Sequence, residues 1–445
     1  MNECSGDNWR IVVGDVRDGL RSMPDGSAHC CVTSPPYWGL RDYGVDGQIG
    51  SEPTPEVFVA TMVDVFREVR RVLRDDGTVW LNLGDSYTSG GRKTRDPGKS
   101  KIHPSYEGDA YKDGMRPDTP PGLKPKDLCG IPWRVALALQ EDGWYLRSDI
   151  IWHKPNPMPS SVTDRPTTSH EYVFLLAKSE RYFYDAEAIR ERSSPNTNLR
   201  ASKSEIARIS EARAAGANTS VGKVPSPKAV EYDGLTKQNR GFETAVCLPV
   251  ESRNARTVWK IATQPFRDAH FATFPEALPR RCILAGTSER GVCPSCGAPW
   301  LRVINSERVR TRPGTDSKAY EPSKDKKQDA LGKRTYTGFN ERWKQSQEIG
   351  NRDPGRHVSI KRTIGWEPTC KCDAGDPIPA TVLEPFAGSG TTLAVARQLG
   401  RAAIGCELNP EYAAIAEKRI NQAIRPTTYR DESKEDDAPL FRQGA

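Results

Sequence analysis

The short segment TSPPYWG at residues 33–39 combines groups that could bind a flat ring carrying an amino group. Pro35 and Pro36 fix their φ angles and carry no amide hydrogen, so the carbonyl groups of Ser34 and Pro35 can face a ligand instead of a sheet ladder. These carbonyls and the Ser34 hydroxyl can accept hydrogen bonds from an exocyclic NH2 group, and Tyr37 offers a face on which an unstacked base can lie. The alternative is an ordinary Pro-Pro turn that ends a strand.

A second segment, TVLEPFAGSGTTLAVARQLGRAAIGCELNPEY at residues 381–412, has the pattern strand, glycine loop, helix, strand and helix. Gly388 and Gly390 would let the backbone approach a ligand, and Glu407 ends the second strand where a ribose would bind. No Lys follows the glycines and the third glycine of a dinucleotide fingerprint is missing, which disfavours a phosphate ligand. Glu384, before the loop, would repel phosphate but attract a sulfonium and an ammonium group. The segment therefore predicts S-adenosylmethionine as the cofactor.

Together the two segments resemble those of S-adenosylmethionine-dependent DNA amino-methyltransferases, and the TSPPY form is typical of the N4-cytosine subgroup. The catalytic turn precedes the cofactor loop, as in the β arrangement of this family, in which a target-recognition region lies between them. The resemblance covers most of residues 9–186 and 256–424. The further segments that carry it are IVVGD at 11–15, WLNLGDSY at 80–87, RSDIIWHKPNPMP at 147–159, HEYVFLLAKS at 170–179 and HFATFPEALPRRCI at 270–283.

The resemblance implies roles for individual residues. It places Asp15 near the adenine of the cofactor, Asp85 in the cofactor pocket and Glu407 on the ribose hydroxyls. Asp15 and Asp85 could instead cap turns, and Phe274 could be an ordinary core aromatic. The resemblance assigns the target amine to Ser34, Pro35, Pro36 and Tyr37, the methionine and loop side of the cofactor to Glu384, Phe386, Gly388, Ser389, Gly390 and Thr391, and the segment that closes over the methionine end to Phe274 and Pro275.

The implied reaction needs no nucleophilic side chain. Acceptors on Ser34 and Pro35 would bind the N–H groups of the target amine and favour the pyramidal form of its nitrogen, so that the methyl group moves in one in-line step. Methylation at cytosine C5 would instead require a Cys nucleophile after a proline, and no Pro-Cys dipeptide occurs in the chain. Because the amine must reach Tyr37, the base has to leave the duplex.

Two other functions fit parts of the sequence. An amino-methyltransferase acting on protein glutamine or RNA also uses a Pro-Pro-Tyr turn, but generally places it after the cofactor loop. A non-catalytic DNA-binding regulator would not need intact motifs at residues 34–37 and 388–391. Within the favoured class, Ser34 in place of Asp or Asn favours cytosine N4, and adenine N6 stays the alternative.

The pattern of apolar residues predicts the elements that must position these motifs. Residues 10–34 alternate strand-like runs with a short helix, and residues 55–74 carry apolar side chains at helical spacing, ended by Gly77. With the cofactor segment, these elements predict an α/β fold with a Rossmann-like methyltransferase sheet and a circularly permuted motif order. The apolar positions of the helix are Val57, Phe58, Phe66, Val69 and Leu73. Further strands are expected at 78–83, 145–152 and 171–177, with a helix at 131–141.

Composition limits the class of protein without identifying it. The 445 residues include 36% hydrophobic residues, enough to bury the core of one large domain or two smaller ones. A net charge of +7 with a pI near 8.8 suits double-stranded DNA as partner but does not require it. Mean hydropathy is −0.67 and no signal peptide or membrane span is recognised, which predicts a cytoplasmic protein with no membrane partner. A cognate restriction endonuclease is a further expected partner, and no oligomeric state is predicted.

The motif blocks divide the chain into expected domains. Two halves form the methyltransferase domain, and a polar, basic region between them is the candidate for target recognition, with a disordered insertion as the alternative. A loop rich in Gly, Pro and Lys is expected to be mobile; its Lys93, Arg95, Lys99 and Lys101 could contact phosphates or simply be solvated. The expected bounds are 1–186 for the catalytic half with its loop at 88–127, 187–255 for target recognition, 256–292 and 373–424 for the cofactor half, and 425–445 for a flexible tail.

Two cysteine pairs, CPSC at 293–296 and CKC at 370–372, depart from the minimal plan of the family. Eleven cysteines in a cytoplasmic chain should be reduced, metal-bound or buried. Two close pairs can form a tetrahedral zinc knuckle, structural in kind because four protein ligands leave no open position. The knuckle would close the base of the charged insertion at 301–369, which is not expected to fold alone; four free thiols are the alternative. The predicted ligands are Cys293, Cys296, Cys370 and Cys372, and the clipped region is 293–372.

Overall fold

The computed structural model describes residues 2–40, 45, 47–88, 119–192, 252–264, 274–310, 357–373 and 375–423. The chain divides into two compact units. The first contains Met1–Ile189, Ala255–Arg302 and Trp366–Ala445, and the second contains Arg190–Asn254 and Val303–Gly365. The expected mobile loop with its four basic residues, the target-recognition region and the tail lie largely outside the described residues, and their assignments stay predictions.

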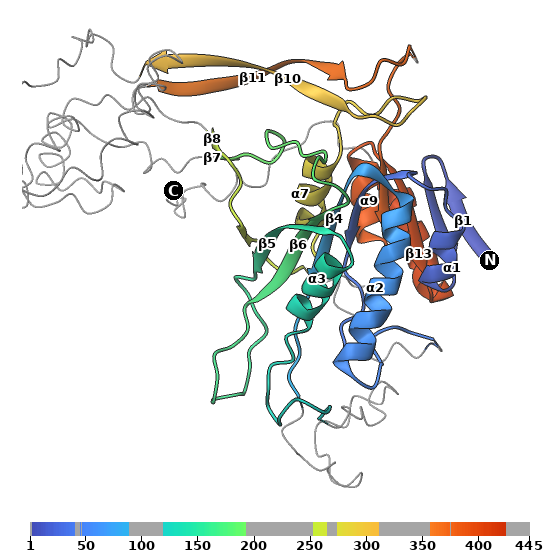
Figure 1. The fold of residues 1–445 in the computed structure, drawn as a ribbon, viewed down its shortest axis with the longest axis vertical. Helices are drawn as coiled ribbons and strands as arrows, with labels where there is room; N and C mark the ends of the chain where they lie inside the picture. The colour runs from blue at the N-terminus through green and yellow to red at the C-terminus, as the bar shows by residue number, and fades with distance from the viewer. Residues whose placement is uncertain are drawn as a thin grey trace, which may run out of the picture. The chain divides into compact units, whose positions relative to one another are not determined.

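A nine-stranded mixed sheet forms the centre of the first unit (Figure 1). Its order is β1-β2-β13-β12-β3-β4-β6-β5-β9. The five neighbours β2, β13, β12, β3 and β4 run parallel, β6 is antiparallel to both β4 and β5, and β9 is parallel to β5. The strands are β1 Asn2–Gly6, β2 Trp9–Val13, β3 Ala28–Thr33, β4 Leu73–Leu83, β5 Tyr145–His153, β6 His170–Ala177, β9 Val258–Lys260, β12 Thr381–Glu384 and β13 Ala402–Glu407.

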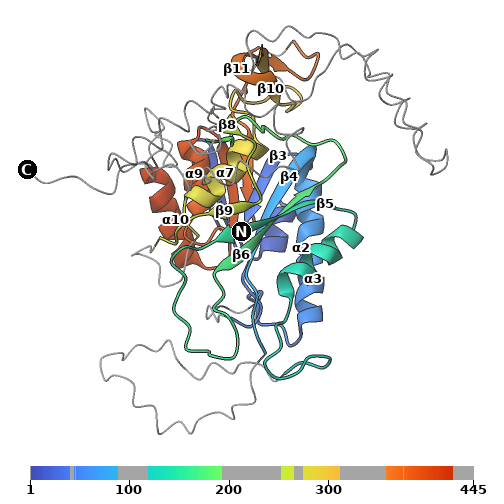
Figure 2. The same cartoon turned by 90° about the vertical axis from the view of Figure 1, so that its left-hand side faces the viewer.

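Helices cover both faces of this sheet (Figure 2). The helices α1, α2 and α3 pack in one apolar core, and α7, α9 and α10 pack in a second core on the opposite side of the strands. In the longest helix, α2, Phe58, Met62, Val65, Phe66 and Val69 follow one stripe and are wholly buried. The bounds of these helices are α1 Val16–Arg21, α2 Pro55–Val72, α3 Ile131–Glu141, α7 Ala277–Gly286, α9 Thr391–Gln398 and α10 Pro410–Gln422.

The expected strands, the helix at 131–141 and the strand–loop–helix–strand–helix segment are confirmed, but the end of α2 differs from the prediction. The helix ends at Val72 and the chain continues directly into β4, so that Gly77 lies inside a strand. Leu73 adopts an extended conformation because it pairs with Ala28 of β3, and sheet pairing here outweighs the helical pattern. Val57 was expected on the buried stripe but is 45% exposed.

The two ends of the insertion at 301–369 form strands. β10 Trp300–Arg310 and β11 His357–Pro368 pair as a separate two-stranded sheet. An isolated pair of strands is at best marginally stable in water, so the expectation that the insertion does not fold alone stays a prediction. A second small pair, β7 Glu191–Arg192 with β8 Ser252–Arg253, is antiparallel. Among the helices in the described parts of the chain, none is long and apolar enough to cross a membrane.

Candidate active site

The two sequence motifs meet at the carboxyl edge of the parallel strands. β12 pairs with β3 so that Val382 lies beside Cys30 and Leu383 beside Cys31. The Pro-Pro turn begins directly after β3 and the glycine loop directly after β12, so the two start on neighbouring strands. The carboxyl ends of neighbouring parallel strands are where open α/β sheets bind ligands. The structure therefore brings together two segments that lie far apart in the chain.

The Tyr37 hydroxyl is held by a network of polar side chains. It lies 2.8 Å from Glu171 Oε2 and 3.2 Å from Asn82 Oδ1, and the Ser34 hydroxyl donates to it at 3.3 Å. Glu171 also accepts from Asn82 Nδ2 at 3.2 Å and forms an ion pair with Lys154. The ring packs against the backbone of Gly84, where an added Cβ would lie 2.6 Å from Tyr37 Cε2. The ring is thus in close contact with Gly84, and the hydrogen bonds of its hydroxyl fix its orientation.

The turn itself is anchored from both sides. Trp38 is buried, and its indole N–H donates to the carbonyl of Glu52 at 2.8 Å. The amide of Gly39 donates to the carbonyl of Gly50 at 2.9 Å. In the part of the chain that the structure describes, no donor occupies the carbonyls of Ser34 and Pro35. These acceptors keep their capacity for a ligand, as the sequence suggested.

Sequence reasoning missed Asn82 and Glu171, which hold Tyr37, and Lys154, which pairs with Glu171. Glu171 lies at the start of β6 and Lys154 follows the end of β5. Because β6 runs antiparallel to both β4 and β5, these residues reach the same edge of the sheet as Tyr37. Only the pairing of β4 with β6 brings Asn82 of β4 and Glu171 together. The one sequence signal was a charged pair in the segments KPNPMP and HEYVF that match the family.

The glycine loop has the backbone geometry that glycine allows. Gly388 and Gly390 have φ values of +53° and +77°, in the region that side chains disfavour. A Cβ on Gly390 would also lie 2.9 Å from Cα of Ala416 in α10, so the loop and this helix are in close contact. The amide of Ala387 donates to the carbonyl of Cys406 at 2.8 Å. The loop is therefore held against β13 and α10.

Glu384 is fully buried at the end of β12. Its oxygens accept hydrogen bonds from the amide of Phe386 at 3.1 Å and from the Thr392 hydroxyl at 2.8 Å. Burial raises the pKa of this carboxyl to about 8, against an ordinary value of 4.5. In this structure the carboxyl braces both ends of the loop, and a charge on it is costly unless a cation lies close by.

Glu407, at the end of β13, is in contact with the same loop. Its carboxylate accepts from the amide of Gly388 at 2.7 Å and from the amide of Asn409 at 2.9 Å. Burial raises the pKa of this group as well. Its predicted contact with a ribose stays a prediction, but the side chain lies at the loop, where that contact would be made.

Asp15 and Asp85 act as caps in this structure, which is the alternative that the sequence left open. Asp15 accepts from the amide of Arg17 at 2.8 Å at the start of α1, and its hydrogen bond with the Arg17 side chain holds its pKa below the ordinary value. Asp85 accepts from the amides of Ile131 and Gly130 at 3.1 Å, at the start of α3, and burial raises its pKa. Both lie beyond the carboxyl ends of parallel strands, so their predicted contacts with a cofactor remain open.

One further residue at the loop was not expected from the sequence. Arg419 of α10 donates to the hydroxyls of Thr391 at 2.8 Å and Ser389 at 3.3 Å, and pairs with Glu276 at 3.0 Å. Glu276 directly follows Phe274 and Pro275, so Arg419 links the start of α7 to the glycine loop. Phe274 is partly buried against the core, which fits the alternative that it is an ordinary core aromatic. Its role near the cofactor stays a prediction.

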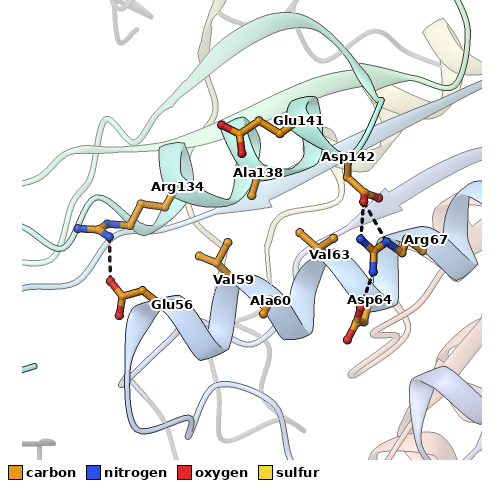
Figure 3. Close-up of a pocket in the computed structure, with 10 residues that line it drawn as sticks. All are labelled: Glu56, Val59, Ala60, Val63, Asp64, Arg67, Arg134, Ala138, Glu141 and Asp142. Carbon is orange, nitrogen blue, oxygen red and sulfur yellow. Dashed lines mark hydrogen bonds and ion pairs between the residues drawn. The ribbon is translucent and has the colours of Figure 1, made fainter.

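A groove of about 520 Å³ lies elsewhere, between α2 and α3 (Figure 3). Its charged residues pair with one another: Arg134 with Glu56 at 3.2 Å, and Arg67 with Asp142 at 2.7 Å. It is lined by residues of two helices on one face of the sheet and not by the loops at the carboxyl edge. It contains neither the Pro-Pro turn nor the glycine loop, so the candidate site is the edge.

Comparisons with known proteins find relatives along most of the chain. The family model described as DNA methylase matches residues 28–293 and 377–418. The Type II methyltransferase M.SmaI of Serratia marcescens is 38% identical over 421 residues, covering 94% of each chain. The Type II methyltransferase M.Cfr9I of Citrobacter freundii is 48% identical over 277 residues, which are 62% of this chain and 72% of that protein. The solved structure of the PvuII DNA methyltransferase (cytosine-N4-specific) is 14% identical, with a TM-score of 0.45 over 96% of this chain and 90% of that one.

Proposed function

The chain belongs to the DNA methylase family of N6 and N4 methyltransferases, and on that premise we propose that it transfers a methyl group from S-adenosylmethionine to N4 of a cytosine flipped out of duplex DNA. The observation that carries the proposal is the pairing of β12 with β3. It sets the acceptors of the Pro-Pro turn beside the glycine loop, so an amine and a methyl donor can share one edge of the sheet.

The residues around the glycine loop fit a cationic cofactor. Glu384, Glu407 and Asp15 lie beyond the carboxyl ends of neighbouring strands, and the loop contains no Lys. Such a set of carboxyl groups would repel a phosphate and attract a sulfonium and an ammonium group. When bound, S-adenosylmethionine supplies a methyl group on a positively charged sulfur. The remainder of the cofactor is then a neutral thioether. We assign Glu384 to its amino-acid end and Glu407 to its ribose.

The chain's own groups position the amine of the target base for methyl transfer. Carbonyls of Ser34 and Pro35, with the Ser34 hydroxyl, accept the N–H groups, while the ring of Tyr37 stacks on the base. The amine nitrogen uses its lone pair to form the new N–C bond, and one N–H proton is then lost to an acceptor at the turn or to water. Catalysis comes from alignment and from stabilising the positive charge that develops on nitrogen.

The choice of cytosine rests on Ser34. A neutral hydroxyl stands where Asp or Asn would favour adenine, and it is oriented by its hydrogen bond to Tyr37. Methylation of adenine N6 is the alternative within the same family. Because M.SmaI and M.Cfr9I are Type II methyltransferases, we further propose that this enzyme modifies one defined DNA sequence and that a restriction endonuclease accompanies it.

The identity of the methylated nucleoside distinguishes cytosine from adenine as the target base. We expect duplex DNA of mixed sequence, incubated with the protein and S-adenosylmethionine labelled in its methyl group, to yield labelled N4-methylcytosine after digestion to nucleosides. Mass spectrometry of the nucleosides is the measurement, with DNA incubated without protein as the control. N6-methyladenine would correct the base, and unlabelled DNA would refute the methyltransferase activity.

We also propose a role in base flipping for an exposed methionine in the loop that follows β5. Met158 is 89% exposed, in the loop between β5 and β6, which extends from the sheet at the edge where these strands reach the candidate site (Figure 1). The loop is held in place: the Asn156 side chain bonds the backbone of Thr263 at 3.1 and 3.4 Å, and Arg165 lies 3.5 Å above the Tyr87 ring. An apolar side chain on a fixed loop can enter a duplex as a wedge. We assign this role to Met158.

A paired-substrate assay tests the wedge. We expect Met158→Ala to slow methylation of a fully paired duplex by about tenfold, since the side chain would no longer offset part of the unstacking cost. A duplex with a mismatch at the target base should be methylated at nearly the wild-type rate, and Met158→Leu should behave as wild type. Equal losses on paired and mismatched duplexes would argue against the wedge.

A further inference from the structure

Four cysteine side chains come together at the base of the insertion. The Sγ atoms of Cys293, Cys296, Cys370 and Cys372 all lie within 4.8 Å of one another. Four sulfurs around a tetrahedral zinc ion at about 2.3 Å would be about 3.8 Å apart, so the cluster needs to contract by less than about 1 Å. The set contains only thiols, and a four-thiolate tetrahedral site is typical of zinc or iron–sulfur centres.

The backbone around the first pair has the form of a metal-binding knuckle. The amide of Gly297 donates to the carbonyl of Cys293 at 2.8 Å, and the amide of Cys293 donates to the carbonyl of Ala298 at 2.8 Å. Gly297 has a φ of +70°, as this reversal requires. The turn brings the sulfurs of Cys293 and Cys296 within 4.8 Å of each other.

The two arms that carry the cysteines are joined by the backbone. The amide of Val292 donates to the carbonyl of Ile378 at 2.8 Å, and the amide of Ile378 returns a bond at 2.9 Å. The Thr369 hydroxyl donates to the carbonyl of Pro299 at 2.8 Å. The arms therefore meet on both sides of the cysteines, although the whole insertion separates them in sequence.

The knuckle is also connected to the strands of the active site, at their amino ends. His29 of β3 accepts from the amide of Thr381 of β12 at 3.0 Å through Nδ1, so its Nε2–H donates to the carbonyl of Gly297 at 3.1 Å. Arg74 donates to the carbonyl of Cys296 at 2.6 Å. The cysteines thus lie at the edge of the sheet opposite the methyl-transfer site, where a metal would have no part in chemistry.

We propose that Cys293, Cys296, Cys370 and Cys372 bind one structural Zn²⁺ ion, which closes the base of the insertion and fixes it to the amino ends of β3 and β12. The four thiolates leave no open position for water, so the ion has a structural role. A cross-link across so long a connection removes much of the freedom of the unfolded chain, and the binding free energy contributes to folding.

Metal analysis of the intact protein tests this site without reference to its activity. We expect about one zinc ion per chain after purification in reducing buffer without added metal, measured by plasma mass spectrometry. Release of zinc by a mercurial reagent should lower Tm, because the arms would lose their cross-link. Cobalt substitution should give the absorption bands of a tetrahedral thiolate site.

Matched variants identify the ligands. Cys370→Ser should reduce the zinc content at least tenfold, whereas Cys370→His, which restores a ligand, should retain it. Cys4→Ser, in β1 and outside the cluster, is the control and should keep a full complement of zinc. If Cys370→Ser is insoluble, cobalt spectra of Cys370→His against wild type give the same assignment, through a shift of the thiolate bands. Protein without zinc whose four thiols react freely, a disulfide within the cluster, or bound iron alone would overturn the proposal.

Discussion

Replacing Tyr37 with alanine should reduce the rate of methyl transfer on the order of 100-fold while cofactor affinity stays near that of the wild type. The ring supplies a stacking face for the flipped base, and its hydroxyl ties the turn to Glu171 and Asn82. Tyr37→Phe keeps the ring and removes only the hydroxyl, so we expect a loss of about tenfold. The measurement is the single-turnover rate on duplex DNA with saturating cofactor, together with the equilibrium affinity for the cofactor.

A second variant tests whether the position of the Tyr37 ring matters for methyl transfer, and a third serves as a control. Gly84→Ala places a Cβ against the ring, so it should slow transfer while Tyr37 stays intact. Tyr145→Ala removes an exposed tyrosine from the opposite end of β5 and should have little effect. Wild-type turnover in Tyr37→Ala would show that the Pro-Pro turn is not where the target base binds, and with it the proposed site would fail.

Cofactor affinity should rise with pH up to about pH 8, because Glu384 has a raised pKa in the free protein. A carboxyl group that is neutral when free and charged beside the cofactor's ammonium must release a proton on binding. Between the pKa values of the bound and free forms, affinity then increases by up to about tenfold per pH unit. Titration calorimetry from about pH 5.5 to 7.5, below the range in which an α-amino group loses its proton, measures both the affinity and the protons released.

The stability of the cofactor-free protein should fall as pH rises, whereas its affinity for the cofactor should rise. The pKa of Glu384 is about 8 when folded and near 4.5 when unfolded, so the unfolded chain releases this proton first. The contribution of the group to the free energy of unfolding is therefore greatest below about pH 4.5 and is lost as pH rises to about 8. A cation bound beside Glu384 removes this penalty, which links the two effects.

Glu384→Gln isolates the carboxyl. We expect it to weaken cofactor binding by about 10- to 100-fold at pH 7.5, as hydrogen bonds to charged groups do, and to flatten the pH dependence. The substitution keeps the size of the side chain, so the brace to Thr392 can persist. Wild-type affinity that does not vary with pH would exclude Glu384 as the group that receives the cofactor's charge.

The local sequence determined the elements around each motif. Glycines at 388 and 390, an acidic residue at the end of each flanking strand and a helical pattern after the loop are short-range signals, because backbone freedom and side-chain spacing act within one turn or strand. The same holds for α3, whose bounds were predicted residue for residue. Prediction from the local sequence fails at the end of α2, because Leu73 pairs with Ala28, which lies more than forty positions away in the chain.

Only the tertiary structure decided which side chains meet. Glu171 reaches Tyr37 because β6 runs antiparallel to β4, and Lys154 reaches Glu171 because β5 ends at the edge where β6 begins. No local pattern encodes the direction in which a strand is inserted. Asp85 caps α3 and Arg419 holds the glycine loop for the same reason: each contact joins residues distant in sequence. The chain by itself named the groups that could do the chemistry, while the order and direction of nine strands brought them to one edge.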